Sequence, residues 1–247
     1  MTVFYLKIIA AVTMLVDHFG AAVFSHVVET QAQMATYDMM RSIGRIAFPI
    51  YAYLVAQGCL HTKSIGRYML RLMLLAVVSE VVYDIAFYEQ VGGISFLRNT
   101  NIFFTLFLGV AAIALYEQVK NRLPETAWRM YVAPIAAVPP MVAAWLLTSD
   151  YGFVGVLLIF AIYIAQPQSR AMRGVTMTLA LCLIYFPVIL TTQGWMLNTH
   201  YMFSLVAVLC VLAYNGRPGR NTAAVKWGFY FFYPVHLAAL IVVRMVL

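Results

Sequence analysis

Apolar segments long enough to cross a lipid bilayer recur from one end of this chain to the other. A helix of about 20 apolar residues spans the roughly 30 Å hydrocarbon core of a membrane. Of the 247 residues, 64% are hydrophobic and 10% are charged, whereas soluble domains carry roughly 25% charged residues. We therefore predict an all-α, polytopic transmembrane helix bundle that forms a single integral membrane domain over residues 1–247.

Polar residues and Gly/Pro pairs separate these segments and predict about nine helices, with a range of eight to ten. The expected helices are 3–25, 43–61, 68–88, 101–119, 128–148, 152–165, 174–192, 197–214 and 225–246. The linker 148–151 predicts either a tight hairpin between the fifth and sixth helices or one broken helix. The first helix contains Lys7, Asp17 and His18 and follows no basic segment, so we expect it to be retained rather than cleaved as a signal peptide.

Basic residues concentrate in alternate loops, which indicates the orientation in the membrane. Eleven of the sixteen Lys and Arg residues lie in the loops after the second, fourth, sixth and eighth helices or in the flanks of these loops: Lys63, Arg67, Arg71, Lys120, Arg122, Arg129, Arg170, Arg173, Arg217, Arg220 and Lys226. Since cytoplasmic loops favour these residues, the N-terminus is predicted inside and the C-terminus outside. The same bias accounts for the net charge of +7, so no nucleic-acid partner is expected.

Ionisable and amide side chains within the predicted helices, at their outer ends and in one outer turn gather at one depth. They are Asp17, His18, Arg41, Arg45, Glu80, Asp84, Asn99, Asn101, Asp150, His200 and His236. Helices that run in opposite directions place these groups in the same outer half of the membrane. Because charged groups inside a membrane are costly and usually face the bundle interior, a shared polar cavity near the outer face is the economical explanation.

Two interpretations remain open for part of this set. Arg41 and Arg45 are four residues apart, as are Glu80 and Asp84, so each pair shares a helix face. They either form a salt-bridged clamp or act directly in the site. Asp17 and His18 are adjacent and diverge by about 100° around a helix, so each needs its own partner. A histidine suits proton transfer near neutral pH, which favours a functional role for His18.

Several short motifs, in this order and spacing, resemble the TraX family, named for the F-pilin acetylation protein. These blocks are Lys7-Ile-Ile-Ala, Met14-Leu-Val-Asp17-His18-Phe-Gly20, Gly44-Arg45-Ile-Ala-Phe48-Pro49-Ile-Tyr-Ala, Arg71-Leu, Ser79-Glu80 with Asp84, Asn101-Ile-Phe-Phe104-Thr105-Leu106, Asp150-Tyr151-Gly152 with Gly155, and Phe229-Tyr-Phe-Phe-Tyr233-Pro234-Val-His236-Leu237. The resemblance covers nearly the whole chain. Val81 follows Ser79-Glu80 where the family pattern suggests a proline, which predicts a straighter third helix.

This resemblance implies a membrane-embedded acetyltransferase of the bacterial cytoplasmic (inner) membrane, similar in kind to other transmembrane acyltransferases. Acetyl-CoA would be the acyl donor, and the acceptor would be an extracytoplasmic amine or hydroxyl such as a pilin N-terminus. The expected catalytic residues are His18, Asp17, Arg45, Asn101 and His236, with His18 as the base or as the carrier of the acetyl group. Basic residues expected to bind the coenzyme's phosphates are Lys63, Arg67, Arg71, Arg122 and Arg173.

Two other functions fit buried Asp, His and Arg residues in a polytopic bundle. The first is a small transporter or proton-coupled carrier that uses these residues as a relay. Against it, the sequence shows neither a repeated half nor a matched pair of broken helices. The second is a non-catalytic scaffold in pilus or secretion assembly. Neither alternative requires acetyl-CoA. The three cysteines have no metal-ligand spacing, so neither a metal site nor a disulfide framework is expected.

Overall fold

The computed structural model describes residues 1–88, 99–126, 128–165, 169–191 and 202–247. Over these residues the chain is all-α, with one isolated bridge between Thr100 and Ser149 as its extended pairing. The predicted fold class is confirmed. Contacts divide the chain into two compact units: unit 1 comprises Met1–Tyr51, Val81–Gly93 and Ser169–Leu247, and unit 2 comprises Ala52–Glu80 and Ile94–Gln168. The assignment of the chain to a single domain stays a prediction.

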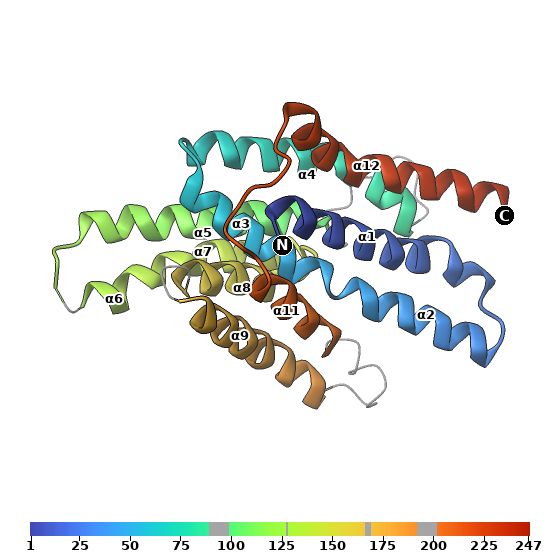
Figure 1. Ribbon diagram of the computed structural model, residues 1–247, viewed down its shortest axis with the longest axis horizontal. Coiled ribbons are helices and arrows are strands. Elements are labelled where there is room, and N and C mark those ends of the chain that lie inside the picture. Colours follow the sequence, from blue (N-terminus) through green and yellow to red (C-terminus); the bar gives the residue numbers. More distant parts are fainter. Residues whose placement is uncertain (89–98, 127, 166–168, 192–201) are drawn as a thin grey trace. The chain divides into compact units, whose positions relative to one another are not determined.

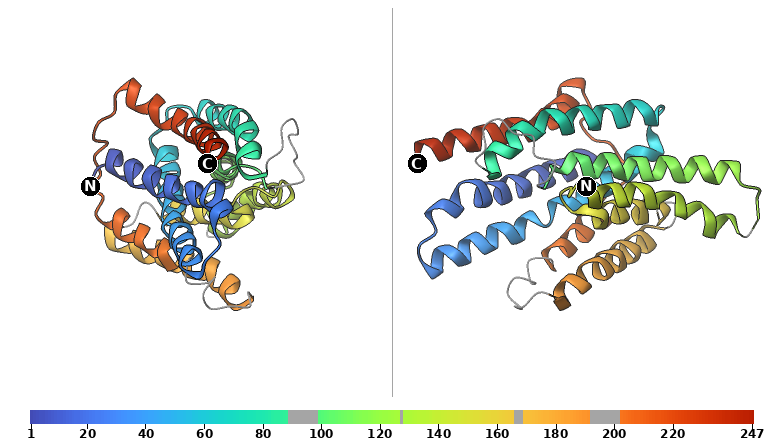
Figure 2. Two further views of the ribbon diagram at one scale, coloured as in Figure 1. Left: turned by 90° about the vertical axis from the view of Figure 1, so that its right-hand side faces the viewer. Right: turned by 180° about the vertical axis from the view of Figure 1, so that it is seen from behind.

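Unit 1 is built around the first helix. Helix α1 (Val3–Ala22) packs against both α2 (Gln31–Gly44) and α12 (Ala223–Val246), and the short helix η1 (Phe24–Val27) leads from α1 toward α2. Figure 1 shows α1 and α2 side by side, and the two views in Figure 2 agree. The same unit contains α9 (Arg170–Thr191), which packs against α11 (Val206–Leu212) after the turn η3 (Phe203–Leu205). The central place of α1 gives its polar residues two helical neighbours.

Helix α2 begins twelve residues before the predicted start at residue 43. Its first turn is a capping box, in which the Gln33 backbone N–H donates to Thr30 Oγ1 at 3.3 Å and the Thr30 backbone N–H donates to Gln33 Oε1 at 2.9 Å. Such a cap satisfies backbone N–H groups that a helix start leaves free. The sequence prediction missed α2 because its residues are too polar to form an apolar run. Helix α3 (Ala47–His61) follows after one turn.

Helix α5 (Ile102–Arg122) is the centre of unit 2. It packs against α7 (Val138–Leu146) and α8 (Gly152–Ala165). A side chain at Gly109 would lie within 3.1 Å of Ile159 Cβ, so this glycine permits the close approach of α5 and α8. The predicted helix 128–148 divides into α6 (Arg129–Val132), η2 (Ala133–Ala137) and α7. Prolines at 134, 139 and 140 remove backbone donors there, which prevents one regular helix.

The link between α7 and α8 is a tight turn, so the hairpin alternative for residues 148–151 is confirmed. Thr148 and Tyr151 take positive φ angles of 46° and 64°, which residues other than glycine adopt uncommonly and which here reverse the chain. The start of α5 holds this turn: the Asp150 N–H donates to the Thr100 carbonyl at 2.9 Å, and Thr105 Oγ1 donates to Ser149 Oγ at 3.0 Å. Thr105 Oγ1 also contacts the Asp150 carbonyl.

Five of the described helical segments are long and apolar enough to cross a membrane. They are Val3–Ala22, Gln31–His61, Ile102–Arg122, Arg129–Leu146 and Ala223–Val246. Helix α4 (Ile65–Tyr88), which carries Glu80 and Asp84, matches the predicted helix 68–88. The predicted helix 197–214 is described only from residue 202 onward. The predicted orientation of the N-terminus toward the cytoplasm stays a prediction.

Candidate active site

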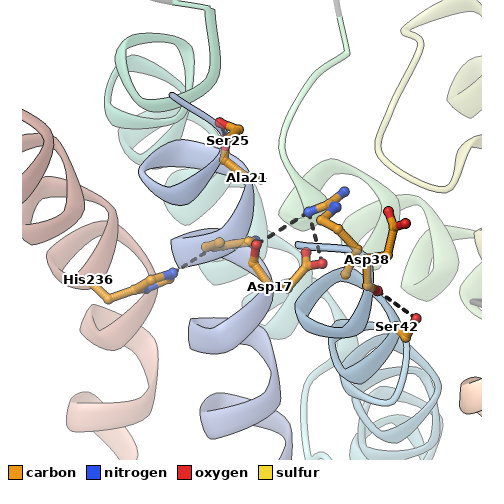
Figure 3. Close-up of polar contacts among 8 residues, drawn as sticks. Asp17, Ala21, Ser25, Asp38, Ser42 and His236 are labelled. Carbon is orange, nitrogen blue, oxygen red and sulfur yellow. Dashed lines mark hydrogen bonds and ion pairs between the residues drawn. The ribbon is translucent and has the colours of Figure 1, made fainter. Parts of the chain in front are cut away.

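Adjacent residues of α1 face two different helices. Figure 3 shows α1, which carries Asp17, between α12 with His236 and α2 with Asp38 and Ser42. Asp17 pairs with Arg41 of α2, and His18 pairs with His236 of α12. The divergence of about 100° between consecutive helical residues explains this division. The sequence expectation that each residue needs its own partner is confirmed.

The contact with α2 is an ion pair packed against a glycine. Arg41 Nη1 lies 2.8 Å from Asp17 Oδ1, and the two side chains are 24% and 17% exposed. A Cβ atom on Gly44 would overlap the Asp17 side chain, so this carboxylate rests directly on the backbone of α2. The positive charge of Arg45, which directly follows α2, also acts on Asp17 and His18. The pair therefore fixes α1 against α2 beside Gly44.

The contact with α12 is a hydrogen bond between two imidazole rings. His18 Nδ1 lies 2.7 Å from His236 Nε2. The ring centroids are 5.0 Å apart and the ring planes differ by 16°, which is the geometry of an in-plane hydrogen bond rather than of face-to-face stacking. On the far side, His236 Nδ1 lies 2.7 Å from the carbonyl oxygen of Phe232. A carbonyl can only accept, so His236 Nδ1 carries a proton.

The tautomer of each neutral ring follows from this chain of contacts. Because His236 Nδ1 donates to Phe232, neutral His236 has a lone pair on Nε2. His18 Nδ1 must then donate to that lone pair, which leaves the lone pair of neutral His18 on its own Nε2. Within the described part of the chain, that nitrogen has no hydrogen-bond partner. The arrangement thus presents one oriented basic nitrogen, on His18.

Aromatic side chains enclose the two histidines. The rings of Phe87 and Tyr233 meet His18 edge-on, with centroids 5.2 Å and 5.8 Å away. Phe232 lies nearly parallel to His236 with centroids 4.8 Å apart. Tyr233 and His236 are buried, whereas His18 keeps some exposed surface. These rings cover most of the pair, and His18 is the less buried of its two residues.

Arg244 of α12 holds the end of α4 that supplies Phe87. Its Nη1 donates to the Ala86 carbonyl at 2.8 Å and its Nη2 donates to the Ile85 carbonyl at 2.9 Å. The last carbonyls of a helix have no partners within the helix, and a cationic side chain there also complements the helix dipole. The Arg244 contact therefore secures the aromatic wall of the His18 pair.

Asn101 lies in unit 2, where it caps the start of α5 and bonds to α4. Its Oδ1 accepts from the Phe103 N–H at 2.9 Å, as the N-cap of α5. Its Nδ2 donates to the Ala76 carbonyl at 2.7 Å and to Glu80 Oε2 at 2.5 Å, and its backbone N–H donates to the same Glu80 oxygen at 3.0 Å. Both amide hydrogens are engaged, so the geometry favours a helix cap over the catalytic role expected from the sequence. Its catalytic assignment stays a prediction.

The basic residues predicted to bind the coenzyme lie on both units. Lys63, Arg67, Arg71 and Arg122 are exposed on unit 2, and Arg173 is half-buried on unit 1. The Arg71 guanidinium lies over the Tyr68 ring at 5.8 Å. Their exposure is suited to a solvated, phosphate-bearing ligand, and their role stays a prediction. No group of three or more metal-ligating side chains occurs among the residues that the structure covers.

Three further expectations from the sequence concern the clamp between two pairs of charged residues, His200 and Asn99. The proposed clamp of Arg41 and Arg45 with Glu80 and Asp84 is wrong for Arg41, whose ion pair is with Asp17. Asp17 meets Arg41 because α1 and α2 are consecutive helices that pack against each other, with the Asp17 side chain against Gly44. His200 lies outside the described residues. Asn99 is exposed at the start of the α5 segment.

The sequence did not point to Phe87, and Tyr233 appeared in it only as part of the last family motif, Phe229 to Leu237. Phe87 belongs to an apolar helix end like many others, so no residue type or spacing marks it. Tyr233 has a weak signal, since it stands three residues before His236 and so shares a helix face with it. Both contacts become visible only once α1, α4 and α12 are placed together within unit 1.

Comparison with known proteins identifies the family. The model of the family described as TraX protein matches residues 4–244. The chain belongs to the TraX family. A relative described as probable fimbrial assembly protein FimC, serogroup H1, from Dichelobacter nodosus is 26% identical over 253 residues, covering 99% of this chain and 96% of the relative. No solved structure matches the chain.

The TraX match runs from the first turn of α1 to the last turn of α12 and so includes both histidines of the pair. The family resemblance drawn from the sequence motifs is therefore confirmed. TraX membership, together with the long apolar helices, makes this chain a multi-pass membrane protein.

Proposed function

We propose that this TraX protein is an acetyltransferase that moves an acetyl group from cytosolic acetyl-CoA to an acceptor outside the bacterial inner membrane. The observation that carries the proposal is the hydrogen-bonded pair His18 and His236, which directs the basic nitrogen of His18 away from its partner. Acyl transfer requires such a nitrogen, either to deprotonate the acceptor or to attack the thioester.

The surroundings of His18 suit the other needs of acyl transfer. Attack on a thioester carbonyl develops negative charge on its oxygen, which fixed positive charges in a poorly solvated site stabilise. Arg41 and Arg45 place two such charges near His18. Asp17 holds Arg41 at 2.8 Å, so the guanidinium is already oriented before substrate arrives. Arg45 is the proposed oxyanion partner, and Asp17 acts through the orientation of Arg41.

The acyl donor would approach from the cytoplasmic side. Lys and Arg side chains bind phosphate groups through charge-assisted hydrogen bonds, and five exposed or half-buried candidates stand in the loops predicted to face the cytoplasm. These are Lys63, Arg67, Arg71, Arg122 and Arg173. Acetyl-CoA is the proposed donor because its phosphates match this charge and its thioester supplies the acetyl group.

The acceptor is proposed to be the N-terminal amine of a pilin subunit. The relative from Dichelobacter nodosus is described as a fimbrial assembly protein, and the TraX resemblance implies pilin acetylation. An amine outside the membrane would reach a site in the outer half of the bilayer, where the predicted topology places His18. The proposal includes a cytoplasmic N-terminus, which the distribution of basic residues supports.

The test compares purified protein in detergent with two variants at His18. Wild type is incubated with radiolabelled acetyl-CoA and a synthetic pilin N-terminal peptide, and acetylated peptide is counted. His18→Ala removes the ring, whereas His18→Gln keeps an amide that can still donate to His236. Both are expected to lose transfer by about 100-fold or more, the usual contribution of general acid–base catalysis.

The matched control is His61→Gln, because His61 Nδ1 also bonds to the carbonyl four residues earlier, Gln57 O, at 2.8 Å. This variant should transfer acetyl groups like wild type. Elution as one monodisperse peak in size-exclusion chromatography verifies folding of each variant. Well-folded wild type that neither binds acetyl-CoA nor acetylates the peptide would overturn the proposed function.

A further inference from the structure

The His18–His236 pair determines more than the presence of a base. A histidine in water favours the tautomer with its proton on Nε2, but the contacts here place the His18 proton on Nδ1. A residue acting as a nucleophile needs a lone pair that points toward the substrate. His236 meets this need. Its Nδ1 proton is donated to the Phe232 carbonyl, so its Nε2 can only accept a hydrogen bond, and His18 must donate from Nδ1 and keep its lone pair on Nε2.

Building on the proposed function, we infer that the acetyl group passes through His18 Nε2 as a covalent intermediate and that His236 is the positioning residue that makes this possible. In the first half-reaction, Nε2 attacks the thioester carbonyl, the C–S bond breaks, and coenzyme A leaves as the thiolate. The proton on His18 Nδ1 stays in the pair and moves onto His236 Nε2. The product is a neutral acetylimidazole hydrogen-bonded to an imidazolium.

The second half-reaction returns the pair to its starting state. An acceptor amine attacks the acetyl carbon, the bond from that carbon to Nε2 breaks, and the proton on His236 returns to His18 Nδ1. The proton lost by the amine balances the one taken up by the thiolate, so the sum is acetyl-CoA plus amine giving coenzyme A plus amide. No oxidant, metal or additional reactant is required.

The surroundings of the pair are consistent with this sequence of steps. Tyr233 and Phe87 meet His18 edge-on, which limits water near the ring and slows hydrolysis of an acetylimidazole. The charges of Arg41 and Arg45 act on His18, the ring that attack on the thioester would leave as an acetylimidazolium. They therefore favour transfer of the shared proton toward His236 after attack. If His236 only held His18 in place, it would need to accept a hydrogen bond but not a proton.

The tautomer can be tested directly in the wild-type protein. In ¹⁵N NMR of protein labelled at histidine, each ring nitrogen reports whether it carries a proton. His18→Gln and His236→Gln samples assign the resonances of the pair. We expect Nδ1 of His18 to be protonated and Nε2 to be unprotonated. A His18 ring protonated on Nε2 would overturn the inference whatever the activity.

The covalent step is tested by isotope exchange without acceptor. Protein is mixed with acetyl-CoA and radiolabelled coenzyme A, and label appearing in acetyl-CoA is counted. Wild type is expected to catalyse the exchange, as is the control His61→Gln. His236→Gln can accept a hydrogen bond through its amide oxygen but cannot take up a proton, so exchange should fall about 100-fold or more while acetyl-CoA binding is kept.

The outcomes separate this inference from the proposed function. Wild type that acetylates the pilin peptide but shows no exchange without it transfers the group directly, which overturns the covalent intermediate and leaves the acetyltransferase standing. Wild type that does not bind acetyl-CoA at all overturns both. Exchange by His236→Gln at the wild-type rate overturns the role of His236 as proton acceptor.

Discussion

Replacing Gly44 by alanine perturbs the site through packing alone, since glycine contributes no chemistry of its own. The added Cβ atom would overlap the Cβ, Cγ and Oδ1 atoms of Asp17, and none of these belongs to the flexible end of a long side chain. Either α1 and α2 separate or the Asp17 carboxylate turns away from Arg41. Both responses disturb the 2.8 Å ion pair.

The expected cost combines two effects. Forcing an extra methyl group into a packed interface costs roughly 1–3 kcal/mol. Breaking a fully buried ion pair costs about 3–5 kcal/mol, and the contribution here is smaller because the two side chains keep 17% and 24% of their exposure. We expect a loss of about 2–4 kcal/mol in the free energy of unfolding. For a chain of this length, Tm should fall by roughly 5–15 °C.

The assay is thermal unfolding in detergent, followed by fluorescence-detected size-exclusion chromatography. Gly228→Ala is the matched control: it makes the same substitution in a helix of unit 1, and nothing lies within 4 Å of its added Cβ atom. Alanine there should stabilise the helix by roughly 0.5–1 kcal/mol. If Gly44→Ala unfolds at the temperature of Gly228→Ala, the close approach of α1 and α2 at Asp17 does not exist and the reasoning is refuted.

Three other substitutions test separate contacts. In a double-mutant cycle, Asp17→Asn and Arg41→Met should show a coupling energy of roughly 0.5–3 kcal/mol in detergent unfolding, and additive effects would mean that the 2.8 Å ion pair contributes nothing. Asn101→Asp should destabilise the protein more than Asn101→Ala, because it sets a second carboxylate against Glu80 in place of a hydrogen bond of 2.5 Å. A higher Tm for Asn101→Asp than for Asn101→Ala would contradict the cap geometry. Arg244→Met should speed hydrogen exchange at the end of α4, because it removes both bonds to the Ile85 and Ala86 carbonyls, and unchanged protection of that helix end in mass spectrometry would count against this contact.

Hydrophobicity predicted the fold class, while individual boundaries depended on local chemistry that apolar runs do not reveal. The bounds of α12 differ by two residues or fewer from the prediction of 225–246. Helix α2 was missed because its stability comes from a capping box and from packing on α1, not from apolar length. The division of the helix predicted at 128–148 follows from three prolines, each of which lacks a backbone donor, although the segment as a whole is an apolar run.

The sequence brought part of the candidate site to one level, but it did not determine which side chains pair. The depth of each polar residue along its helix brought Asp17, His18 and His236 to one level, and the structure places the two histidines in contact. Which arginine would meet Asp17 could not be deduced, because Arg41 and Arg45 share one helix face in the sequence. That choice depends on how α1 crosses α2 at Gly44, a tertiary feature with no local pattern.

The two contacts of α1 form at very different moments while the chain is being synthesised. Arg41 follows Asp17 by 24 residues, whereas His236 follows His18 by 218. At roughly 5–20 residues per second, about 10–40 s separate the appearance of His18 from that of His236. During this interval α1 and α2 can already be joined in the membrane, but His18 has no imidazole partner to set its tautomer. Under the proposed mechanism, the ring that sets the tautomer of His18 is therefore present only once the helix that carries His236 has been made, and a nascent chain has no oriented His18 nitrogen before then.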